Sequence, residues 1–246
     1  MAMAHNAPLQ VLNHNQLGNY RFLGAEGRPF SNGAVADEGY DLVRCTFSRP
    51  IPLEAGLAAA VAHVTRAGRP VEAIAGLELR IPEPFTEAGF ETFNRGYTSS
   101  LKRLGLQADG LLPATRTNAA PVTGRVTEPS VYAVTYSAAG HRPQPAFVLS
   151  GVPESAPGDP GAMLDSIMVV LSARMEELSV SWDNATAIQL YAIEDVQSEV
   201  ADRVLARAGM AGVHGIHWFP SLPPRHGLRL ELDVRSTGTE YVLTES

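Results

Sequence analysis

An arginine stands among small residues in the stretch PATRTNAAP, residues 113–121. The guanidinium group of Arg116 presents a planar fork of N–H donors that matches the two oxygens of a carboxylate or a phosphate. An arginine on an exposed strand is usually a solvated surface residue without a functional role. An arginine on a strand that leads into a pocket usually binds an anion. Arg116 is therefore the first candidate for chemistry, and the rest of the chain must decide between the two interpretations.

Two asparagines are candidates to accompany Arg116. Asn94 lies on the inward face of a predicted helix, which also carries Phe90 and Tyr97. A buried amide needs hydrogen-bond partners, so Asn94 either pins a neighbouring strand or supports a site. Asn118 follows Arg116 by two residues and therefore shares its face of the predicted strand.

The composition bounds the classes of partner. The 246 residues carry a formal net charge of -7, with acidic and basic residues mixed along the chain and no basic block. This pattern argues against nucleic acid and against an anionic membrane as partners. A small anionic substrate remains compatible, because one local cationic site can work inside an acidic protein.

The sequence also bounds localisation and metal chemistry. No apolar run approaches the roughly 18 residues of a membrane span, and residues 1–10 lack the apolar core of a signal peptide. We therefore expect a cytoplasmic protein. The one cysteine, Cys45, cannot form an internal disulfide, and we interpret it as a small core residue. His214 and His217 fall on opposite faces of a strand, so we expect no metal site.

The order of the predicted elements repeats once along the chain. In the first half, the spacing of apolar residues predicts a strand at 41–53, a helix at 54–68, a strand at 71–82, a helix that includes 90–104, and strands at 114–122 and 130–138. In the second half it predicts a strand at 146–153, a helix at 160–179, a strand at 185–193, a helix at 196–209, and strands at 215–222 and 229–236. A turn-rich segment at 138–145 indicates two domains, 1–138 and 139–246.

Each half therefore has the predicted element order β-α-β-α-β-β. This order predicts an α+β fold in which the helices pack on one face of a mixed sheet. A half of about 120 residues has no second layer for the other face of its sheet. We therefore expect self-association across the sheets.

Four motifs of the first half resemble the RidA (YjgF/UK114) superfamily of small imine and enamine deaminases. GRPFSNGAV (27–35) is similar to the family's Gly-Pro-Tyr-Ser-Gln-Ala segment, and TFSRPIPL (46–53) is similar to its Ser-Gly-Gln-Ile-Pro strand. FNRGY (93–97) resembles its Val-Asn-x-x-Tyr helix, and PATRTNAAP resembles its Pro-Ala-Arg-Ser strand. The four motifs occur in the family's order over about residues 20–137, which makes the resemblance fairly specific.

The second half keeps the order of elements but loses these motifs. FVLSG (147–151), VSWDNATAIQLYAI (180–193) and SLPPRHGLRLELDV (221–234) still resemble family segments. However, AGVHGIHWF (211–219) stands where the arginine is expected, and the second helix has no Asn-x-x-Tyr. We interpret this half as a degenerate copy, either structural or lending residues across an interface.

The resemblance implies a tandem of two chorismate-mutase-like halves and a homotrimer with clefts between subunits. It further implies hydrolysis of 2-imino or enamine acids to 2-oxo acids and ammonia, without metal or organic cofactor. Tandem relatives of this length include deaminases of aminomuconate-type acids from nitroaromatic breakdown. We therefore expect an aminomuconate-type substrate, with or without a chlorine substituent, and a 2-hydroxymuconate-type product.

The resemblance also implies roles for individual residues. Arg116 would bind the substrate carboxylate, with Asn94 and Ser48 in support, and Ser48 is also a candidate for contact with the amino nitrogen. Phe30 stands where the family has tyrosine, so it can pack on the carbon chain but offers no hydroxyl. Asn118 stands where many relatives carry cysteine, so their thiol is absent from this place.

Activation of water requires a carboxylate, because water loses a proton as it adds to the iminium carbon and the leaving ammonia gains one. Glu128 lies two or three positions before the place where the family has a glutamate. Glu231 is the corresponding carboxylate of the second half. Both residues remain candidates for the general base.

Two other functions are compatible with the residues. The first is a non-catalytic binding protein for a carboxylate metabolite or a protein partner, which the phenylalanine at position 30 and the missing thiol favour. The second is a chorismate-mutase-like isomerase. That activity needs several cationic groups for a dicarboxylate, and Arg116 alone is placed by a motif, so we rank it last.

Overall fold

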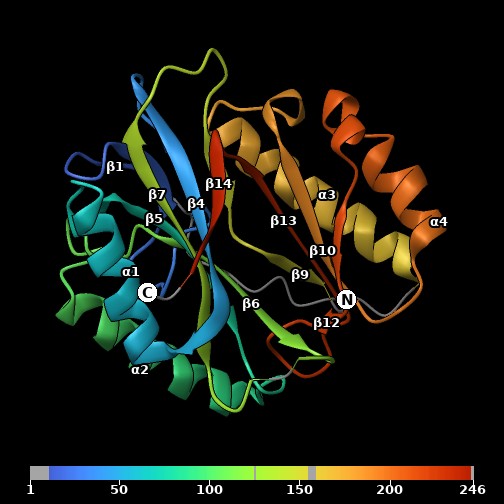
Figure 1. The fold of residues 1–246 in the computed structure, drawn as a ribbon. Coiled ribbons are helices and arrows are strands. Elements are labelled where there is room, and N and C mark those ends of the chain that lie inside the picture. Colours follow the sequence, from blue (N-terminus) through green and yellow to red (C-terminus); the bar gives the residue numbers. More distant parts are fainter. Residues whose placement is uncertain (1–10, 125, 155–158, 245–246) are drawn as a thin grey trace.

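The structure, a computed structural model, describes residues 11–124, 126–154 and 159–244. It contains two mixed β-sheets, each with helices on one face (Figure 1). Sheet I has the strand order β12 (Ser221–Leu222), β6 (Thr115–Pro121), β5 (Ile74–Arg80), β7 (Ser130–Ala139), β4 (Tyr40–Pro52) and β14 (Thr239–Leu243). Sheet II has the order β1 (Val11–Asn15), β2 (Tyr20–Gly24), β3 (Gly33–Ala36), β8 (Phe147–Leu149), β13 (Leu230–Ser236), β10 (Ala187–Tyr191) and β11 (His217–Phe219), and β9 (Val152–Glu154) also pairs with β13. The segment at residues 1–10, in which no signal peptide is predicted, lies outside the described residues.

The helices lie on the outer faces of the two sheets. They are α1 (Leu53–Arg66) and α2 (Glu87–Arg103) on sheet I, and α3 (Pro160–Glu177) and α4 (Gln197–Glu199) on sheet II; shorter 3₁₀ and π segments are η1 (Val71–Ala73), η2 (Trp182–Asn184), η3 (Val200–Leu205) and η4 (Gly209–His214). Figure 1 shows α1 and α2 at the left, α3 and α4 at the right, and the strands between them. The predicted α+β repeat with its helices on one face of each sheet is therefore confirmed.

The helices form where the sequence predicts them, because their apolar residues recur at helical spacing. In α1, Leu57, Ala60 and Val64 are buried against sheet I. Helix α2 begins where the Thr86 side chain accepts a hydrogen bond from the backbone N–H of Gly89. Helix α3 begins at a proline that follows the capping side chain of Asp159.

Three predicted elements differ in detail. The strand predicted at 146–153 is split into β8 and β9 at Ser150 and Gly151. The strand predicted at 215–222 becomes β11 in sheet II and β12 in sheet I, with Pro220 between them. Proline has no N–H for a ladder, which makes it a natural crossing point. The helix predicted at 196–209 is α-helical only at α4 and continues as the π-helical η3.

The two sheets exchange strands between the halves of the chain. Strands β1, β2 and β3 extend sheet II, where β3 pairs with β8. Strand β14 extends sheet I by pairing in parallel with β4. None of these four strands is predicted by the apolar patterns of the sequence. The division into domains 1–138 and 139–246 stays a prediction, but the sheets do not follow it.

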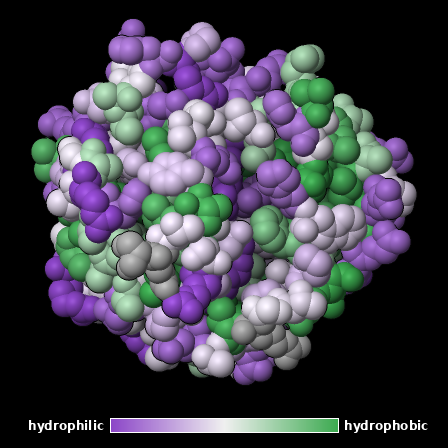
Figure 2. All heavy atoms as spheres, viewed as in Figure 1, coloured by the Kyte–Doolittle hydropathy of each residue, from purple (hydrophilic) through white to green (hydrophobic). Residues whose placement is uncertain are grey.

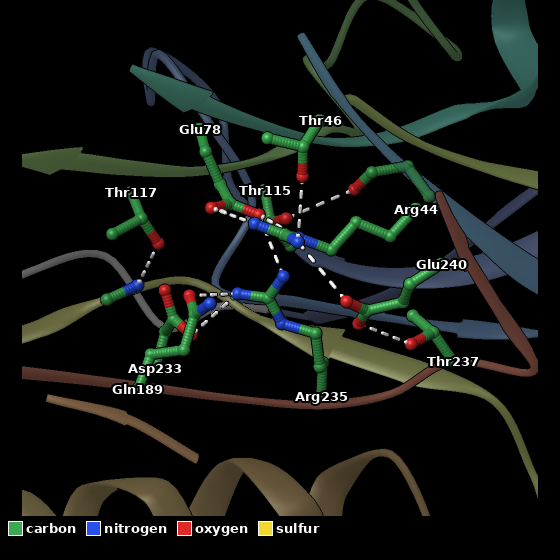
Figure 3. Close-up of polar contacts among 12 residues, drawn as sticks. Arg44, Thr46, Glu78, Thr115, Thr117, Gln189, Asp233, Arg235, Thr237 and Glu240 are labelled. Carbon is green, nitrogen blue, oxygen red and sulfur yellow. Dashed lines mark hydrogen bonds and ion pairs between the residues drawn. The ribbon is translucent and has the colours of Figure 1, made fainter. Parts of the chain in front are cut away.

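A buried ionic network joins the inner faces of the two sheets (Figure 3). Glu78 of β5 accepts hydrogen bonds from Arg44 Nε at 2.6 Å and from Arg235 Nη1 of β13 at 2.8 Å. Arg235 also donates to Gln189 and to Asp233. Burial acts to raise the pKa of Glu78, but the charges of Arg235 and Arg44 outweigh it and hold that pKa well below its usual range.

Part of the cover for each inner sheet face therefore comes from the other half of the same chain. From the sequence alone, we expected that cover to come from other copies of the chain. A homotrimer stays a prediction, because the contacts described lie within one chain.

The outer surface mixes polar and apolar side chains. Figure 2 shows purple and green atoms interspersed on the face seen in Figure 1. Exposed apolar side chains include Val169 of α3 and Met210 and Val213 of η4. Among the described residues, no helix is both long enough and apolar enough to cross a membrane.

We expect Glu78→Gln to destabilise the fold, because Arg44 and Arg235 would stay buried without their shared counter-charge. Breaking a buried ion pair from one side typically costs roughly 3–5 kcal/mol. Chemical denaturation at pH 7 measures the loss. The matched control is Glu240→Gln, since this more exposed residue also pairs with Arg44, at 3.2 Å. The control should lose less than about 1 kcal/mol. Equal losses in both variants would contradict the importance of the network.

Candidate active site

Arg116 lies on β6 and is buried, with 4% of its surface exposed. Its Nη2 donates to Asn94 Oδ1 of α2 at 2.8 Å, and its backbone N–H donates to Ser150 Oγ at 3.1 Å. Its Nη1 is also buried and has no hydrogen-bond partner among the described residues. One arm of the fork is thus fixed and the other is available to a ligand.

Aromatic rings surround this guanidinium. Its central carbon lies 4.5 Å from the ring centre of Phe30 and 4.7 Å from that of Tyr97, and Phe90 and Phe93 are each at 5.5 Å. Ring faces attract a cation and so offset part of its lost hydration. Burial nevertheless lowers the pKa of Arg116 to about 10, against the opposing effects of Tyr97 and Glu231. Arg116 therefore stays charged at neutral pH while lacking a full set of partners.

Glu231 is the carboxylate that the structure brings close to Arg116. It lies on β13, is 2% exposed, and has a buried Oε2 with no hydrogen-bond partner among the described residues. Burial, followed by the charge of Asp233, raises its pKa well above the usual value, although Arg116 and Arg80 oppose the shift. A carboxyl group with a raised pKa keeps its proton to higher pH than an ordinary carboxyl group, so it can serve first as an acid and then as a base.

Gly151 makes room for this carboxyl group. A Cβ atom built on Gly151 would lie 1.7 Å from Glu231 Oε1, so any side chain there would displace the carboxyl group. The backbone N–H of Gly151 donates to Thr117 Oγ1 of β6 at 3.2 Å. The break between β8 and β9 thus brings Glu231 and β6 together.

Two further arginines lie in this region, and the sequence analysis did not select them. Arg174 of α3 donates from Nη1 to the Ser150 carbonyl oxygen at 2.8 Å, while its buried Nε has no partner among the described residues. Burial and, to a smaller extent, the charge of Arg28 together lower the pKa of Arg174 to about 10, against the opposing charges of Glu177 and Glu231. Arg28 also has a buried, unpartnered Nε, and its guanidinium carbon lies 5.9 Å from the Phe30 ring centre. Arg28 lies within the GRPFSNGAV segment but at a position to which the motif gives no role, and Arg174 lies in no motif, because their proximity depends on contacts between distant segments.

The structure gathers only some of the predicted site residues. Arg116, Asn94 and Phe30 lie together, and Asn118 is buried two residues along β6, with its amide oxygen and nitrogen both unpartnered within the described chain. By contrast, Ser48 and Glu128 are exposed. Glu231, the alternative to Glu128, lies in the cluster. Cys45 is buried in the core of sheet I, as predicted.

This cluster can hold an anion. Arg116, Arg174 and Arg28 offer donors, Asn118 offers both a donor and an acceptor, and Glu231 offers a proton or takes one. Buried polar groups are rarely left without partners, so several of them at one place point to a bound molecule. In the described part of the chain, no three His, Cys, Asp or Glu side chains are grouped to bind a metal ion.

Residues 12–241 match the family described as 2-aminomuconate deaminase CnbZ. The chain belongs to this family. It is also 34% identical, over 245 aligned residues, to the 2-amino-5-chloromuconate deaminase of Comamonas testosteroni. The alignment covers 92% of this chain and 96% of that enzyme. The resemblance to aminomuconate deaminases, predicted from the motifs, is confirmed.

Solved structures show more distant similarity to this member of the CnbZ family. A Mycobacterium tuberculosis protein of the YjgF/YER057c/UK114 family is 15% identical, with a TM-score of 0.31, over 39% of this chain and 81% of its own. A chorismatase is 13% identical, with a TM-score of 0.46, over 87% of this chain and 79% of its own.

We expect the stability gain from Glu231→Gln to grow as pH rises. The folded-state pKa of Glu231 is raised, so the folded state binds more protons than the unfolded state between the two pKa values, and wild-type stability falls with rising pH in that window. The variant should match the wild type near pH 4 and exceed it at pH 8, by about 1.4 kcal/mol for each unit of the pKa shift. Urea denaturation at both pH values measures this. Exposed Glu91→Gln is the control and should show no such trend. A variant less stable than the wild type at pH 8 would indicate that Glu231 is ionised by its arginine neighbours.

Proposed function

We propose that the protein is a hydrolytic deaminase of a 2-aminomuconate-type enamine acid. The main support is the position of Arg116, the arginine predicted from a family motif. In this member of the 2-aminomuconate deaminase family, its Nη1 atom is an unpartnered donor among the described residues, Asn94 binds its Nη2 atom, and buried Glu231 lies close by. The products are ammonia and a 2-oxo acid, which enolises to a 2-hydroxymuconate-type acid.

Binding starts at Arg116. The substrate carboxylate next to the amino-bearing carbon accepts hydrogen bonds from Nη1 of Arg116, while Asn94 holds Nη2 in place. Phe30 packs against the conjugated carbon chain. This arrangement fixes the amino-bearing carbon near Glu231, and positioning of this kind lowers the barrier by itself.

Glu231 then moves the protons, starting from its neutral form. It donates a proton to the enamine carbon, which leaves an iminium group on the substrate and a carboxylate on Glu231. The carboxylate takes a proton from water as the water oxygen adds to the iminium carbon. Glu231 returns that proton to the amino nitrogen, ammonia leaves, and the new hydroxyl group gives its proton to Glu231 as the 2-oxo group forms. One water is consumed and Glu231 ends neutral, as it began.

The two exposed candidates for catalytic residues, Ser48 and Glu128, could take part in catalysis only in an assembled protein. Ser48 and Glu128 are exposed in the single chain, so a role for either in catalysis requires another subunit to cover them. We therefore assign proton transfer to Glu231 and keep Ser48 as a predicted contact of the assembled protein only.

We expect Arg116→Ala to lose turnover while the fold survives. Loss of a charge-assisted, two-pronged contact weakens transition-state binding by roughly 2–4 kcal/mol, which corresponds to about 30- to 1,000-fold in kcat/KM. Arg116→Lys should lose nearly as much, because a point charge does not reproduce the fork. Ammonia release from freshly generated 2-aminomuconate, with EDTA present, measures the activity.

Circular dichroism controls for folding of these variants. Folded Arg116→Ala with near-normal turnover would remove the carboxylate contact from the mechanism. A wild-type protein that binds the acid without releasing ammonia would instead be the non-catalytic binding protein.

We also expect a homotrimer in solution. In support, sheet I ends at β14 with Tyr241 and Val242 exposed, and such an open strand edge favours association. Light scattering should give three times the chain mass of 26.3 kDa. A monomer that turns over substrate would contradict the trimer and would leave Ser48 without a role.

A further inference from the structure

The candidate site carries more positive charge than one substrate carboxylate can balance. The charges of Arg116 and Arg28 act on each other, as do those of Arg174 and Arg28. Two carboxyl groups act on these arginines: buried Glu231, whose pKa its burial raises well above the usual value, and Glu177, which acts on Arg174 and is exposed to solvent. Like charges held together away from water are costly unless an anion joins them. With one carboxylate on Arg116, the buried Nε atoms of Arg174 and Arg28 still have no hydrogen-bond partner among the described residues.

Arg174 and Arg116 both donate hydrogen bonds to the same residue, Ser150. Ser150 accepts the backbone N–H of Arg116 on its side-chain oxygen and Nη1 of Arg174 on its carbonyl oxygen. The side chain of Ser150 in turn donates to the carbonyl oxygen of Ser31, close in sequence to Arg28 and Phe30. Ser150 thus ties the backbone of β6 at Arg116 to the guanidinium of Arg174, while Asn94 holds the guanidinium of Arg116.

The free donors of these arginines lie in the buried interior. Nη1 of Arg116, Nε of Arg174 and Nε of Arg28 are all buried without a hydrogen-bond partner among the described residues. An arginine placed only to stabilise the fold would be expected to use these donors. Unpartnered donors on two different elements, β6 and α3, with Glu231 near enough to act on both arginines, therefore suit a molecule with an anionic group at each end.

We propose that Arg174, assisted by Arg28, binds a second carboxylate of the substrate, so that the C-terminal half of the chain selects dicarboxylic acids. This inference rests on the proposed function in one respect, namely that Arg116 binds the first carboxylate. The half that lacks the arginine motif thereby supplies the other anchor from α3. The reacting carbon lies between the two carboxylates, beside Glu231.

The test uses two unreactive six-carbon dienes that differ by one carboxylate. Muconate (hexa-2,4-dienedioate) carries two, and sorbate (hexa-2,4-dienoate) carries one. Isothermal titration calorimetry on the full chain should show that the wild type binds muconate at least about tenfold more tightly than sorbate. That ratio corresponds to one charge-assisted contact of about 1.4 kcal/mol.

The variants separate the two anchors. Arg174→Gln should bring the affinity for muconate down to that for sorbate and leave the affinity for sorbate within about threefold. Arg116→Gln should weaken both ligands. Arg174→Lys keeps the charge and should retain part of the preference, and it serves as the second variant if Arg174→Gln does not fold. The control is Arg103→Gln, an exposed arginine paired with Glu54, which should change neither affinity.

The outcomes distinguish this inference from the proposed function. Equal wild-type affinity for muconate and sorbate, or equal weakening of both by Arg174→Gln, overturns the second anchor even if 2-aminomuconate is deaminated. A preference that depends on Arg174 supports the second anchor even if no ammonia is released. In that case the proposed reaction fails and the dicarboxylate site stands.

Discussion

The buried carboxylate of Glu78 is the interaction on which the rest of the structure depends. It accepts hydrogen bonds from an arginine of its own sheet and from an arginine of the other sheet, with distances of 2.6–2.8 Å (Figure 3). Burying three charges is costly, and the cost is offset only when the geometry holds all of them together. The network therefore fixes how β5 and β13 lie relative to each other. That placement brings Arg116, on the strand next to β5, close to Glu231, on β13 itself.

The network and the candidate site also share charges. Arg80 acts on both Glu78 and Glu231, and Asp233, which binds Arg235, raises the pKa of Glu231. The protonation of Glu231 is thus set in part by residues whose main task is to join the sheets. A substitution in the network can alter proton transfer without touching the substrate, so structural and catalytic effects are coupled in this chain.

The sequence predicted what depends on local spacing, and it missed what depends on contacts between distant segments. Helices α1, α2 and α3 and the Arg116–Asn94 pair follow from periodicity and from motifs that survive in the first half. Arg174 carries no motif, and its role becomes visible only when Ser150 places it beside β6. Strand β14 is short and exposed, and its pairing with β4 joins residues almost 200 positions apart. The sequence left Glu128 and Glu231 both open as the general base for a similar reason. Only the packing of the two sheets shows which of the two carboxyl groups is buried.

The exchange of strands between the sheets bears on how such a chain is made and how it can evolve. During synthesis, β3 emerges before its neighbour β8, which follows more than 100 residues later. Sheet I in turn lacks the strand beside β4 until β14 has been synthesised. Each half therefore waits for the other, which favours slow folding and makes chaperone protection valuable. Because each sheet contains strands from both halves of the chain, neither half can be separated as an independent module, and removal of one half would leave open strand edges on the other.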